Sequence, residues 1–387
     1  MIDSPKVLIV VNVDWFFTSH RLPVALAARE RGARVVIAAA DTGRAAAIRE
    51  CGFEFIPIPF SRKGWNPVTE LRAVYRLIRT YRQIVPDLVH HVTIKPIIYG
   101  SIAARLAGPR AVINAVTGLG FSFSTNRRAA VWRPLVKLLY RLALRLPTGC
   151  TVFQNPEDRD YFVHERLVEV ERTALIRGSG VDCSRFRPVA EAPGLLTVML
   201  PGRMLWDKGV GLFVEAARQL RSRRTDSRFV LVGPIDEGNP SAVPEAQIQA
   251  WAAEGIVEWW GYQADMQETL SRAHIVALPA IQREGLPKVL LEAAACARPV
   301  VAGDVPGCRE IVRPDVNGIL VPPGDRTALA LALERLLDSA ELRGRFGCAG
   351  RKIVEQEFAQ QIVVNETLDL YARMLGGAWW QAGAERR

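Results

Sequence analysis

Short apolar runs alternate with amphipathic segments along most of this chain, and the alternation occurs twice. In the first half, Lys6–Val13 and Arg34–Ala39 are apolar runs separated by a helical pattern over Leu22–Arg31. The pattern restarts at Leu195–Leu200, which precedes a helical pattern over Val210–Ser222. Apolar strands that alternate with helices are typical of a parallel sheet covered on both faces. The sequence therefore predicts an α/β protein with two doubly wound, Rossmann-like units. In such units ligands bind at the carboxyl ends of the strands, so we expect a cleft between the units to hold the site.

The domain boundaries follow from this repeat. Residues 1–180 are expected to form the N-terminal unit and residues 195–358 the C-terminal unit, with a linker at 181–194. No stretch approaches the roughly 18 uninterrupted apolar residues that a membrane span needs. The N-terminal apolar run is too short and too early for a signal peptide. We therefore expect a cytoplasmic protein.

Charge is distributed unevenly between the halves. Residues 1–180 contain 26 Lys and Arg against 14 Asp and Glu, for a net charge of +12, whereas the remainder carries 24 against 26. This asymmetry predicts an anionic partner for the first half, and nucleic acid and anionic lipid both fit. No recognised nucleic-acid-binding motif or basic–aromatic stacking surface supports nucleic acid. The anionic partner expected here is therefore a membrane surface.

Metal and cofactor sites have no sequence support. The chain has six cysteines without a C-x-x-C pair and five histidines without metal-ligand spacing. These patterns predict neither a zinc site nor a disulfide framework. We expect no bound metal and no cofactor.

Two cations follow the first strand of the second unit. Arg203 and Lys208 come directly after Leu195–Leu200, and a helix begins near Gly209. Guanidinium binds phosphate oxygens as a fork, ammonium binds them as a point charge, and a helix N-terminus adds free N–H groups. These features predict a phosphate site. The alternative is a solvated loop with two surface cations.

A second candidate lies at a later strand end. Glu292 falls within Val289–Ala297, where nearly every other residue is apolar, and Pro287 suits the first turn of that helix. A carboxylate buried on such a helix is unfavourable unless something binds it. Ribose hydroxyls would supply two donors. The alternative is a glutamate that reaches solvent or a neighbouring arginine.

These elements together resemble glycosyltransferase family 4, which has the GT-B fold, over essentially the whole chain. The resemblance rests on the following pieces in this order: Gly180-Val181-Asp182 with Phe186 and Pro188, Gly202-Arg203 with Lys208-Gly209, and Glu284-Gly285-Leu286-Pro287 with Glu292.

The resemblance implies roles for these residues. Arg203 and Lys208 would contact the donor diphosphate, Glu292 the ribose and Glu284 the donor sugar. Backbone N–H groups of Gly285 and Leu286 would face the phosphate. It also implies transfer with retention of anomeric configuration, no divalent metal, and a C-terminal helix in residues 359–387 that crosses back to the first unit.

One segment matches the metal–nucleotide motif of a different glycosyltransferase fold. Asp158-Arg159-Asp160 is formally D-x-D. It follows Asn155-Pro156-Glu157, which is typical of a helix cap with proline at the first position and acids in the first turn. We interpret it as a helix start.

Acceptor-side candidates lie at strand ends of the first unit. Asp14 is either a general base or acceptor contact, or a cap of the following helix. Gly118, in Thr117-Gly118-Leu119-Gly120, either lets the backbone approach the donor or forms a tight turn. The family often has a histidine near this strand end, which this chain lacks. His90 and His91 are weak substitutes for it.

A basic helix is predicted after this loop. Arg133, Lys137, Arg141 and Arg145 recur every four residues beside Trp132, and Leu135, Leu138, Leu142 and Leu146 form an opposing stripe. Such helices lie on anionic membranes. A second helix carries Arg72, Arg76, Arg79 and Arg82, preceded by Arg62-Lys63-Gly64-Trp65. The alternative is two packed helices with solvated basic faces. We expect peripheral association with the inner face of the cytoplasmic membrane.

The N-terminal half is also similar to bacterial enzymes that extend undecaprenyl-diphosphate-linked sugars, especially lipid-linked N-acetylgalactosaminyltransferases. The similarity rests on Val11-Asn12-Val13-Asp14-Trp15-Phe16-Phe17 with His20-Arg21-Leu22-Pro23, on His91-Val92-Thr93-Ile94-Lys95-Pro96, and on Ala115-Val116-Thr117-Gly118-Leu119-Gly120. It implies a UDP-N-acetylhexosamine donor and an undecaprenyl-diphosphate-linked sugar acceptor. A nucleotide-sugar epimerase or phosphorylase, and a non-catalytic nucleotide-sugar-binding protein, remain as alternatives.

Overall fold

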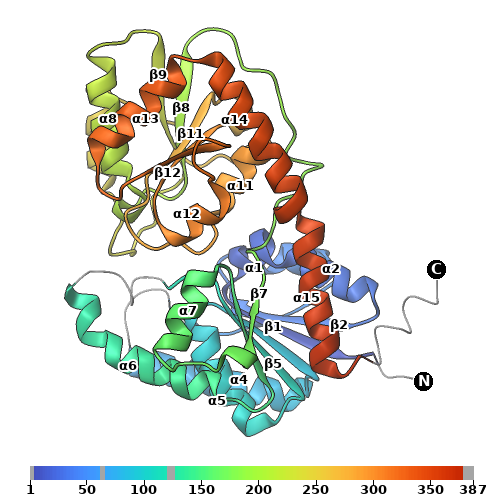
Figure 1. Ribbon diagram of the computed structural model, residues 1–387. Coiled ribbons are helices and arrows are strands. Elements are labelled where there is room, and N and C mark those ends of the chain that lie inside the picture. The colour runs from blue at the N-terminus through green and yellow to red at the C-terminus, as the bar shows by residue number, and fades with distance from the viewer. Residues whose placement is uncertain (1–3, 62–65, 120–126, 378–387) are drawn as a thin grey trace. The chain divides into compact units, whose positions relative to one another are not determined.

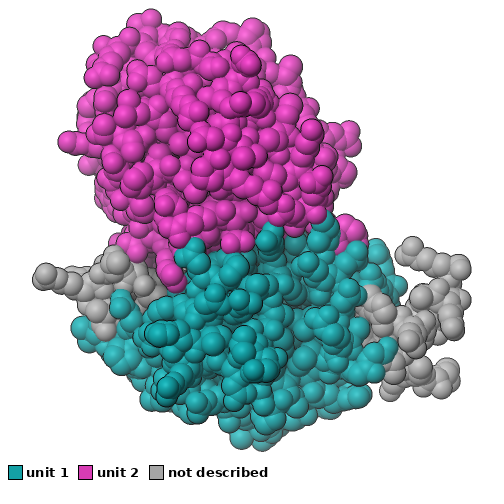
Figure 2. Space-filling model, viewed as in Figure 1, with its two compact units in different colours: residues 1–179, 362–387 teal, residues 180–361 magenta. Residues whose placement is uncertain are grey.

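The chain forms two compact units. The computed structural model describes residues 4–61, 66–119 and 127–377. Unit 1 comprises residues 1–179 and 362–387, and unit 2 comprises residues 180–361 (Figure 2). Residues 181–194, expected as a linker, are grouped with unit 2.

Unit 1 is built on a parallel sheet of seven strands in the order β3-β2-β1-β4-β5-β6-β7. The strands are β1 (Lys6–Val13), β2 (Arg34–Ala40), β3 (Glu54–Pro57), β4 (Leu88–Val92), β5 (Ala111–Val116), β6 (Gly149–Phe153) and β7 (Thr173–Leu175). The first five match the apolar runs in the sequence. The last two were not predicted, because each is short and follows a segment without clear strand signals. The order reverses between β1 and β4, which is where such sheets bind ligands.

Helices cover both faces of this sheet (Figure 1). They are α1 (Asp14–His20), α2 (Leu22–Glu30), α3 (Ala45–Glu50), α4 (Pro67–Ile84), α5 (Ile94–Ala107), α6 (Arg127–Leu144), α7 (Pro156–His164) and α15 (Gln360–Leu375). One apolar core lies between the sheet and α2, α3 and α15. Another lies under α4 and α5. Because successive side chains of a strand point to opposite faces, β1 supplies Val7 and Ile9 to the first core and Leu8 and Val10 to the second.

The C-terminal helix α15 is part of unit 1. Val363, Leu368 and Tyr371 are fully buried in the first core of that unit. The chain therefore returns to the N-terminal sheet after it has completed unit 2.

Unit 2 repeats the architecture with a parallel sheet of six strands in the order β10-β9-β8-β11-β12-β13. The strands are β8 (Leu196–Pro201), β9 (Ser227–Val232), β10 (Glu258–Trp259), β11 (Ile275–Leu278), β12 (Val300–Gly303) and β13 (Gly318–Val321). The helices are α8 (Val210–Arg221), α9 (Glu245–Ala253), α10 (Met266–Ser271), α11 (Lys288–Ala295), α12 (Pro306–Ile311), α13 (Arg326–Leu337) and α14 (Ala340–Ile353). Its order reverses between β8 and β11, so the phosphate-site candidates follow the two strands at the reversal.

No helix in the described ranges is both long and apolar enough to cross a membrane. Helix α6 begins at Arg127, and Pro134 lies inside it.

Candidate functional site

The charged residues predicted in unit 2 meet at the carboxyl edge of its sheet. Lys208, which follows β8, places its Nζ 2.7 Å from Oε1 of Glu284, which follows β11. Both side chains are largely buried, with 15% and 23% of their surface exposed. The two residues are 76 positions apart in sequence and meet because β8 and β11 are neighbours.

Arg203 has a partner that sequence analysis did not single out. Its Nη1 lies 2.5 Å from Oδ2 of Asp236, whose side chain is only 7% exposed. Asp236 follows the end of β9, the strand beside β8. The signal that would have found it is an acidic residue shortly after a buried strand, next to the strand that Arg203 follows. Each predicted phosphate-binding cation is therefore held in place by one carboxylate.

Glu292 is buried on α11, as its apolar neighbours predicted. It is 9% exposed, and its Oε1 lies 3.7 Å from Lys288 Nζ one turn earlier on the helix. Burial raises the pKa of this carboxyl group, while the positive charges of Lys288 and Arg185 act in the opposite direction. The ionised form therefore has little compensation within the chain, and a ligand that donates hydrogen bonds would stabilise it.

Close backbone contacts fix the loops at this edge. A Cβ added to Gly209 would lie 2.0 Å from the carbonyl oxygen of Pro279. A Cβ on Gly307, in α12, would lie 1.4 Å from the carbonyl oxygen of Gly285. Gly209 also has a left-handed φ of +77°, which glycine adopts without strain. The loop that carries Lys208 and the one that carries Glu284, Gly285 and Leu286 therefore sit in positions that a larger residue would displace.

Neutral polar atoms without partners mark the strand-order reversal of unit 1. Asn12 Oδ1, at the end of β1, and Thr93 Oγ1, just after β4, are buried and have no hydrogen-bond partner among the described residues. The two residues directly follow the register pair Val11 and Val92. Thr93 also has φ +77° and ψ 165°, a region that residues other than glycine rarely adopt. Buried unpaired polar groups and backbone strain both cluster at ligand sites, so this is the acceptor-side candidate of unit 1. In the sequence, Asn12 and Thr93 stood out only as members of the segments on which the family resemblance rests.

Asp14 is already saturated by its own chain. Its carboxylate is fully buried and accepts hydrogen bonds from the backbone N–H groups of Trp15, Thr42 and Arg44, each at 2.7 Å, and from the Thr42 hydroxyl. Burial raises its pKa, but these hydrogen bonds outweigh that effect and hold the pKa below its usual value. A carboxylate with a lowered pKa is a weak base, so the geometry favours a structural role for Asp14. The residue is not the helix cap expected as the alternative, because the N-cap of α1 is Val13. It ties α1 to the loop after β2.

Gly118 follows β5 at the same edge of the sheet. Its φ is +133°, within the range that favours glycine. Its neighbour Gly120 lies outside the described residues. The turn thus needs glycine at 118, and a role in donor binding stays a prediction.

His90 and His91 lie within β4 and form a buried network. His90 Nδ1 pairs with the Tyr371 hydroxyl on α15 at 2.7 Å, and His91 pairs with the Tyr81 hydroxyl at 2.7 Å and with Asn114 Oδ1 at 2.8 Å. Burial holds the pKa of His90 well below its usual value, and it lowers that of His91 to about 4. Both rings are therefore neutral structural groups rather than sugar contacts.

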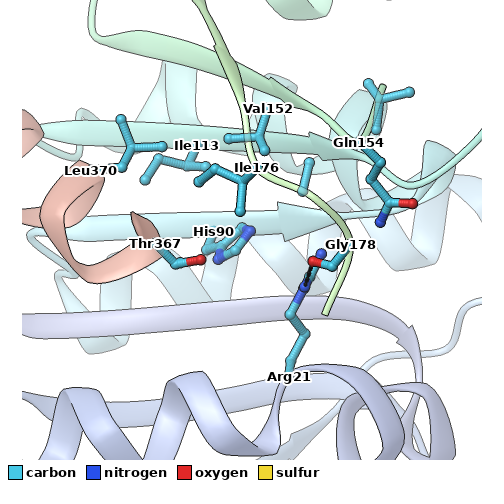
Figure 3. A pocket seen from close by; sticks show the side chains of 11 residues that line it. Arg21, His90, Ile113, Val152, Gln154, Ile176, Gly178, Thr367 and Leu370 are labelled. Carbon is cyan, nitrogen blue, oxygen red and sulfur yellow. Dashed lines mark hydrogen bonds between the residues drawn. The ribbon is translucent and has the colours of Figure 1, made fainter. Parts of the chain in front are cut away.

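A small cavity beside His90 does not fit a substrate. Figure 3 shows it between Arg21, His90 and Thr367, with Arg21 donating to the carbonyl of Gly178 at 3.3 Å. Its volume is about 10 Å³. That is the space of about one water molecule, so neither a sugar nor a nucleotide enters.

The basic helix α6 differs from its prediction. Lys137 pairs with Glu165 at 2.8 Å, and Arg141 donates to the carbonyls of Glu165 and Arg166, so these cations bind the end of α7. The exposed stripe is instead apolar, with exposed fractions of 40% to 76%: Val131, Trp132, Leu135, Leu138 and Leu142. Arg133 is half-buried, Leu146 is buried, and Arg145 is exposed. The cations were expected to face outward because the sequence does not show that α7 ends beside them.

Helix α4 combines both kinds of side chain on its outer surface. Val68, Leu71 and Tyr75 are 66% to 70% exposed, and Arg72, Arg79 and Arg82 are exposed as well. Arg76 is half-buried. The preceding Arg62-Lys63-Gly64-Trp65 lies outside the described residues.

The D-x-D segment is a helix start, as predicted. Asn155 caps α7, its Oδ1 accepting from the Asp158 N–H at 2.7 Å, and Asp160 pairs with Arg159. Asp158 is buried by these contacts. This segment therefore has a structural explanation.

Family models match both halves of the chain. A model described as glycosyl transferases group 1 matches residues 196–339, and one described as glycosyl transferase 4-like matches residues 6–147. The two matches fall on the sheets of unit 2 and unit 1.

Individual relatives span nearly the full length. An N,N'-diacetylbacillosaminyl-diphospho-undecaprenol alpha-1,3-N-acetylgalactosaminyltransferase of Campylobacter jejuni is 26% identical, over 92% of this chain and 95% of its own. A UDP-Gal:alpha-D-GlcNAc-diphosphoundecaprenol alpha-1,3-galactosyltransferase of Escherichia coli is 26% identical, over 82% and 83%. The crystal structure of Anabaena HepE in complex with UDP superposes with a TM-score of 0.76 at 19% identity, over 95% of this chain and 100% of that one.

Proposed function

Because the chain belongs to glycosyltransferase family 4 and has the GT-B fold, we propose that it transfers a sugar from a UDP-sugar to an undecaprenyl-diphosphate-linked sugar. The proposed donor is a UDP-N-acetylhexosamine and the proposed pathway is surface glycan assembly. The two relatives above bear names of enzymes that act on undecaprenyl-diphosphate-linked sugars, and one name specifies a UDP donor.

The observation that carries the proposal is the charged set at the carboxyl edge of unit 2. Arg203 and Lys208 are each positioned by a carboxylate, and a diphosphate would displace or share those contacts. Two cations at a leaving diphosphate stabilise the negative charge that develops there, which is the task a metal ion performs in other enzymes. This arrangement supports transfer without a divalent metal.

Glu292 supports nucleotide binding at the same edge. Among the described residues, the 3.7 Å contact with Lys288 and the more distant charge of Arg185 partly offset the desolvation of its buried carboxylate. Two ribose hydroxyls would donate hydrogen bonds to it. Glu284, beside Lys208, would then contact the donor sugar.

We assign retention of anomeric configuration as the stereochemical course. The acceptor hydroxyl oxygen would attack the anomeric carbon on the face from which UDP departs. The bond from that carbon to the phosphate oxygen breaks, and the hydroxyl proton passes to the departing diphosphate. Asp14 is not assigned as the base, because its oxygens are already occupied by four donors.

On the acceptor side, Asn12 and Thr93 are the proposed sugar contacts. Asn12 Oδ1 accepts a hydrogen bond and the Thr93 hydroxyl can donate or accept, which suits an uncharged sugar hydroxyl. The apolar stripe of α6 and the arginines of α4 would rest on an anionic membrane, which makes the protein peripheral. The lipid-linked acceptor would then be reached from the membrane surface.

The test is stabilisation by nucleotide, with the unmodified protein and two variants. UDP at about 100 times its dissociation constant should raise the unfolding free energy of unit 2 by roughly 2.7 kcal/mol, and GDP and ADP should do less. Glu292→Gln should weaken UDP binding, while Glu341→Gln, an exposed change on α14, should not. Equal responses of the two variants to UDP would contradict the ribose assignment. Product analysis with a UDP-sugar and a lipid-linked acceptor then separates transfer from epimerisation.

A further inference from the structure

An open pocket of about 500 Å³ lies in unit 1, away from the edge that carries the acceptor candidates. It is formed by the end of α6, the turn before β6, the end of α7 and the loop before β7. These segments all precede strands, so the pocket is at the amino edge of the sheet. Asn12, at the end of β1, and Thr93, just after β4, lie at the carboxyl edge. The pocket is therefore a separate site within the same unit.

Three arginines and one acid line the pocket. Arg172 donates to the Leu146 carbonyl at 2.7 Å and pairs with Glu169 at 3.1 Å, so the acid is neutralised within the lining. Arg145 and Arg166 are exposed, and in the part of the chain that the structure describes their side chains have no hydrogen-bond or ion-pair partner. Two guanidinium groups thus remain for a ligand.

The loop that presents Arg166 is held in an unusual conformation. Arg166 has φ +55°, where glycine would be less strained. The Arg141 guanidinium fastens this turn by donating to the carbonyls of Glu165 and Arg166. Arg141, which the sequence suggested as a membrane contact, is a positioning residue for this loop.

The rest of the lining is apolar. Leu144 and Val168 are buried, and Val163 and Pro147 complete the wall. A pocket with an apolar wall and a cationic rim suits an anion that carries an apolar body, and its volume is in the range of small-molecule sites. A fully hydrated ion would gain nothing from the leucine and valines.

The pocket lies at one end of the exposed apolar stripe of α6. Leu142, the last member of the stripe, is 54% exposed and stands three residues before Arg145. A helix that lies with such a stripe in the membrane interface places its flanking cations at the level of the headgroups. The pocket would then open where lipid phosphates are found.

The geometry points to a binding pocket for the phosphodiester headgroup of an anionic phospholipid, with Arg145 and Arg166 on the phosphate and Leu144 and Val168 against the glycerol and first acyl carbons. This inference rests on the membrane association in the proposed function and adds a defined lipid site to it. Bound lipid would fix the orientation of unit 1 on the bilayer, beyond what general charge attraction provides.

The experiment uses the full-length protein and dihexanoyl-phosphatidylglycerol kept below its micelle concentration, so that no surface is present. The variant Arg145→Gln/Arg166→Gln is compared with Arg221→Gln/Arg223→Gln, which removes the same charge from exposed positions at the end of α8 in unit 2. We expect the unmodified protein and the unit 2 variant to bind the lipid within about twofold of each other. The pocket variant should bind at least about tenfold more weakly, because it loses two charge-assisted hydrogen-bonding groups.

Three outcomes would contradict the proposed lipid site. Binding of the unmodified protein to phosphatidylglycerol vesicles but not to the monomeric lipid would mean that surface charge alone accounts for attachment, and the proposed function would stand. Equal losses of lipid affinity in the two double variants would also contradict the proposed pocket. Inorganic phosphate that competes as strongly as the short-chain lipid would make it a free-phosphate site. Stabilisation by UDP, measured in each variant, reports that unit 2 is folded and tests the proposed function independently.

Discussion

The carboxyl edges of the two sheets are equivalent in topology but differ in chemistry. In unit 2 the edge carries charges in pairs, with Lys208 against Glu284 and Arg203 against Asp236. In unit 1 the edge carries one charged pair, Lys95 with Glu70, and, among the described residues, neutral polar atoms without partners on Asn12 and Thr93. The charges at the edge of unit 2 thus suit an anion, whereas Asn12 and Thr93 at the edge of unit 1 suit an uncharged, hydroxyl-rich ligand.

The difference extends to how each edge is kept in shape. Unit 2 relies on contacts so close that only glycine fits, such as Gly209 against Pro279. Unit 1 holds a strained Thr93 and relies on buried hydrogen bonds, including the four to Asp14 and the histidine network behind β4. A substitution that disturbs packing should therefore destabilise unit 2 more than unit 1. A change in protonation should destabilise unit 1 more than unit 2.

The largest effect is expected from Gly209→Ala. Its Cβ would meet the Pro279 carbonyl oxygen at 2.0 Å in a backbone conformation of φ +77°. We expect a loss of about 4 kcal/mol or more from the stability of unit 2, because overlap with backbone adds to the left-handed strain. Hydrogen exchange resolved by peptide measures it for each unit separately. The matched control is Gly255→Ala, with φ +70° and open space around the new methyl, which should lose only about 1 kcal/mol. Similar losses for both would mean that the close contact is unimportant.

The next effect concerns activity. Lys208→Met should lower turnover about 10²- to 10³-fold, since it removes one of two charges proposed to stabilise the leaving diphosphate. It also leaves Glu284 without its 2.7 Å partner. Lys352→Met, on the exposed surface of α14, is the control and should retain activity. Normal turnover of Lys208→Met with a saturating donor would mean that the charge of Lys208 does not stabilise the leaving diphosphate.

The third prediction is a loss of unit 1 stability in mild acid. Burial lowers the pKa of His91 to about 4 and that of His90 well below its usual value, so the folded state excludes protons that the unfolded chain binds below pH 6.5. The contribution of these neutral histidines to the stability of unit 1 is therefore fully present above about pH 6.5. It is lost as the pH drops toward 4, by up to about 3 kcal/mol for His91. Peptides of β4 and α15 should lose exchange protection before those of unit 2, where burial also lowers the pKa of one histidine, His274, beside β8 and β11. His91→Gln should flatten the dependence of unit 1 on pH. If both units respond alike, the histidine network does not explain the difference.

Much of the fold could be predicted from the sequence, because apolar runs and helical periods are local signals. The strands β1, β2 and β8 and the helix α8 lie within a residue or two of their expected positions. The cations of unit 2 were found for the same reason, since a charge directly after a buried strand is a local pattern. Glu292 was found because a carboxylate stands out on an apolar helix.

The missed features depend on distant partners. Asp236 matters because β9 lies beside β8, and Lys137 turns inward because α7 ends beside α6. The outward face of α6 was consequently assigned to its cations, whereas the structure exposes its leucines. The sequence could not decide whether Asp14 acts as a base or as a helix cap, because its hydrogen-bond donors at Thr42 and Arg44 come from another loop. Thr93 has no signal in the sequence because its strain is a property of backbone angles alone.

The substitution with the smallest expected effect on stability tests the carboxyl edge of unit 1 most directly. Thr93→Gly should raise the stability of unit 1 by about 1 kcal/mol or less. It relieves a left-handed φ of +77° and removes a buried hydroxyl that has no partner in the described part of the chain, although glycine also gains freedom in the unfolded chain. The same change should raise the KM for the lipid-linked acceptor by about tenfold and leave UDP binding unchanged, because the hydroxyl is lost only from the acceptor side. Thr93→Ser keeps the hydroxyl and should keep the native KM. A stabilised Thr93→Gly protein with a native acceptor KM would mean that the strain has no part in acceptor binding, and the chemical difference between the two edges would then rest on Asn12 alone.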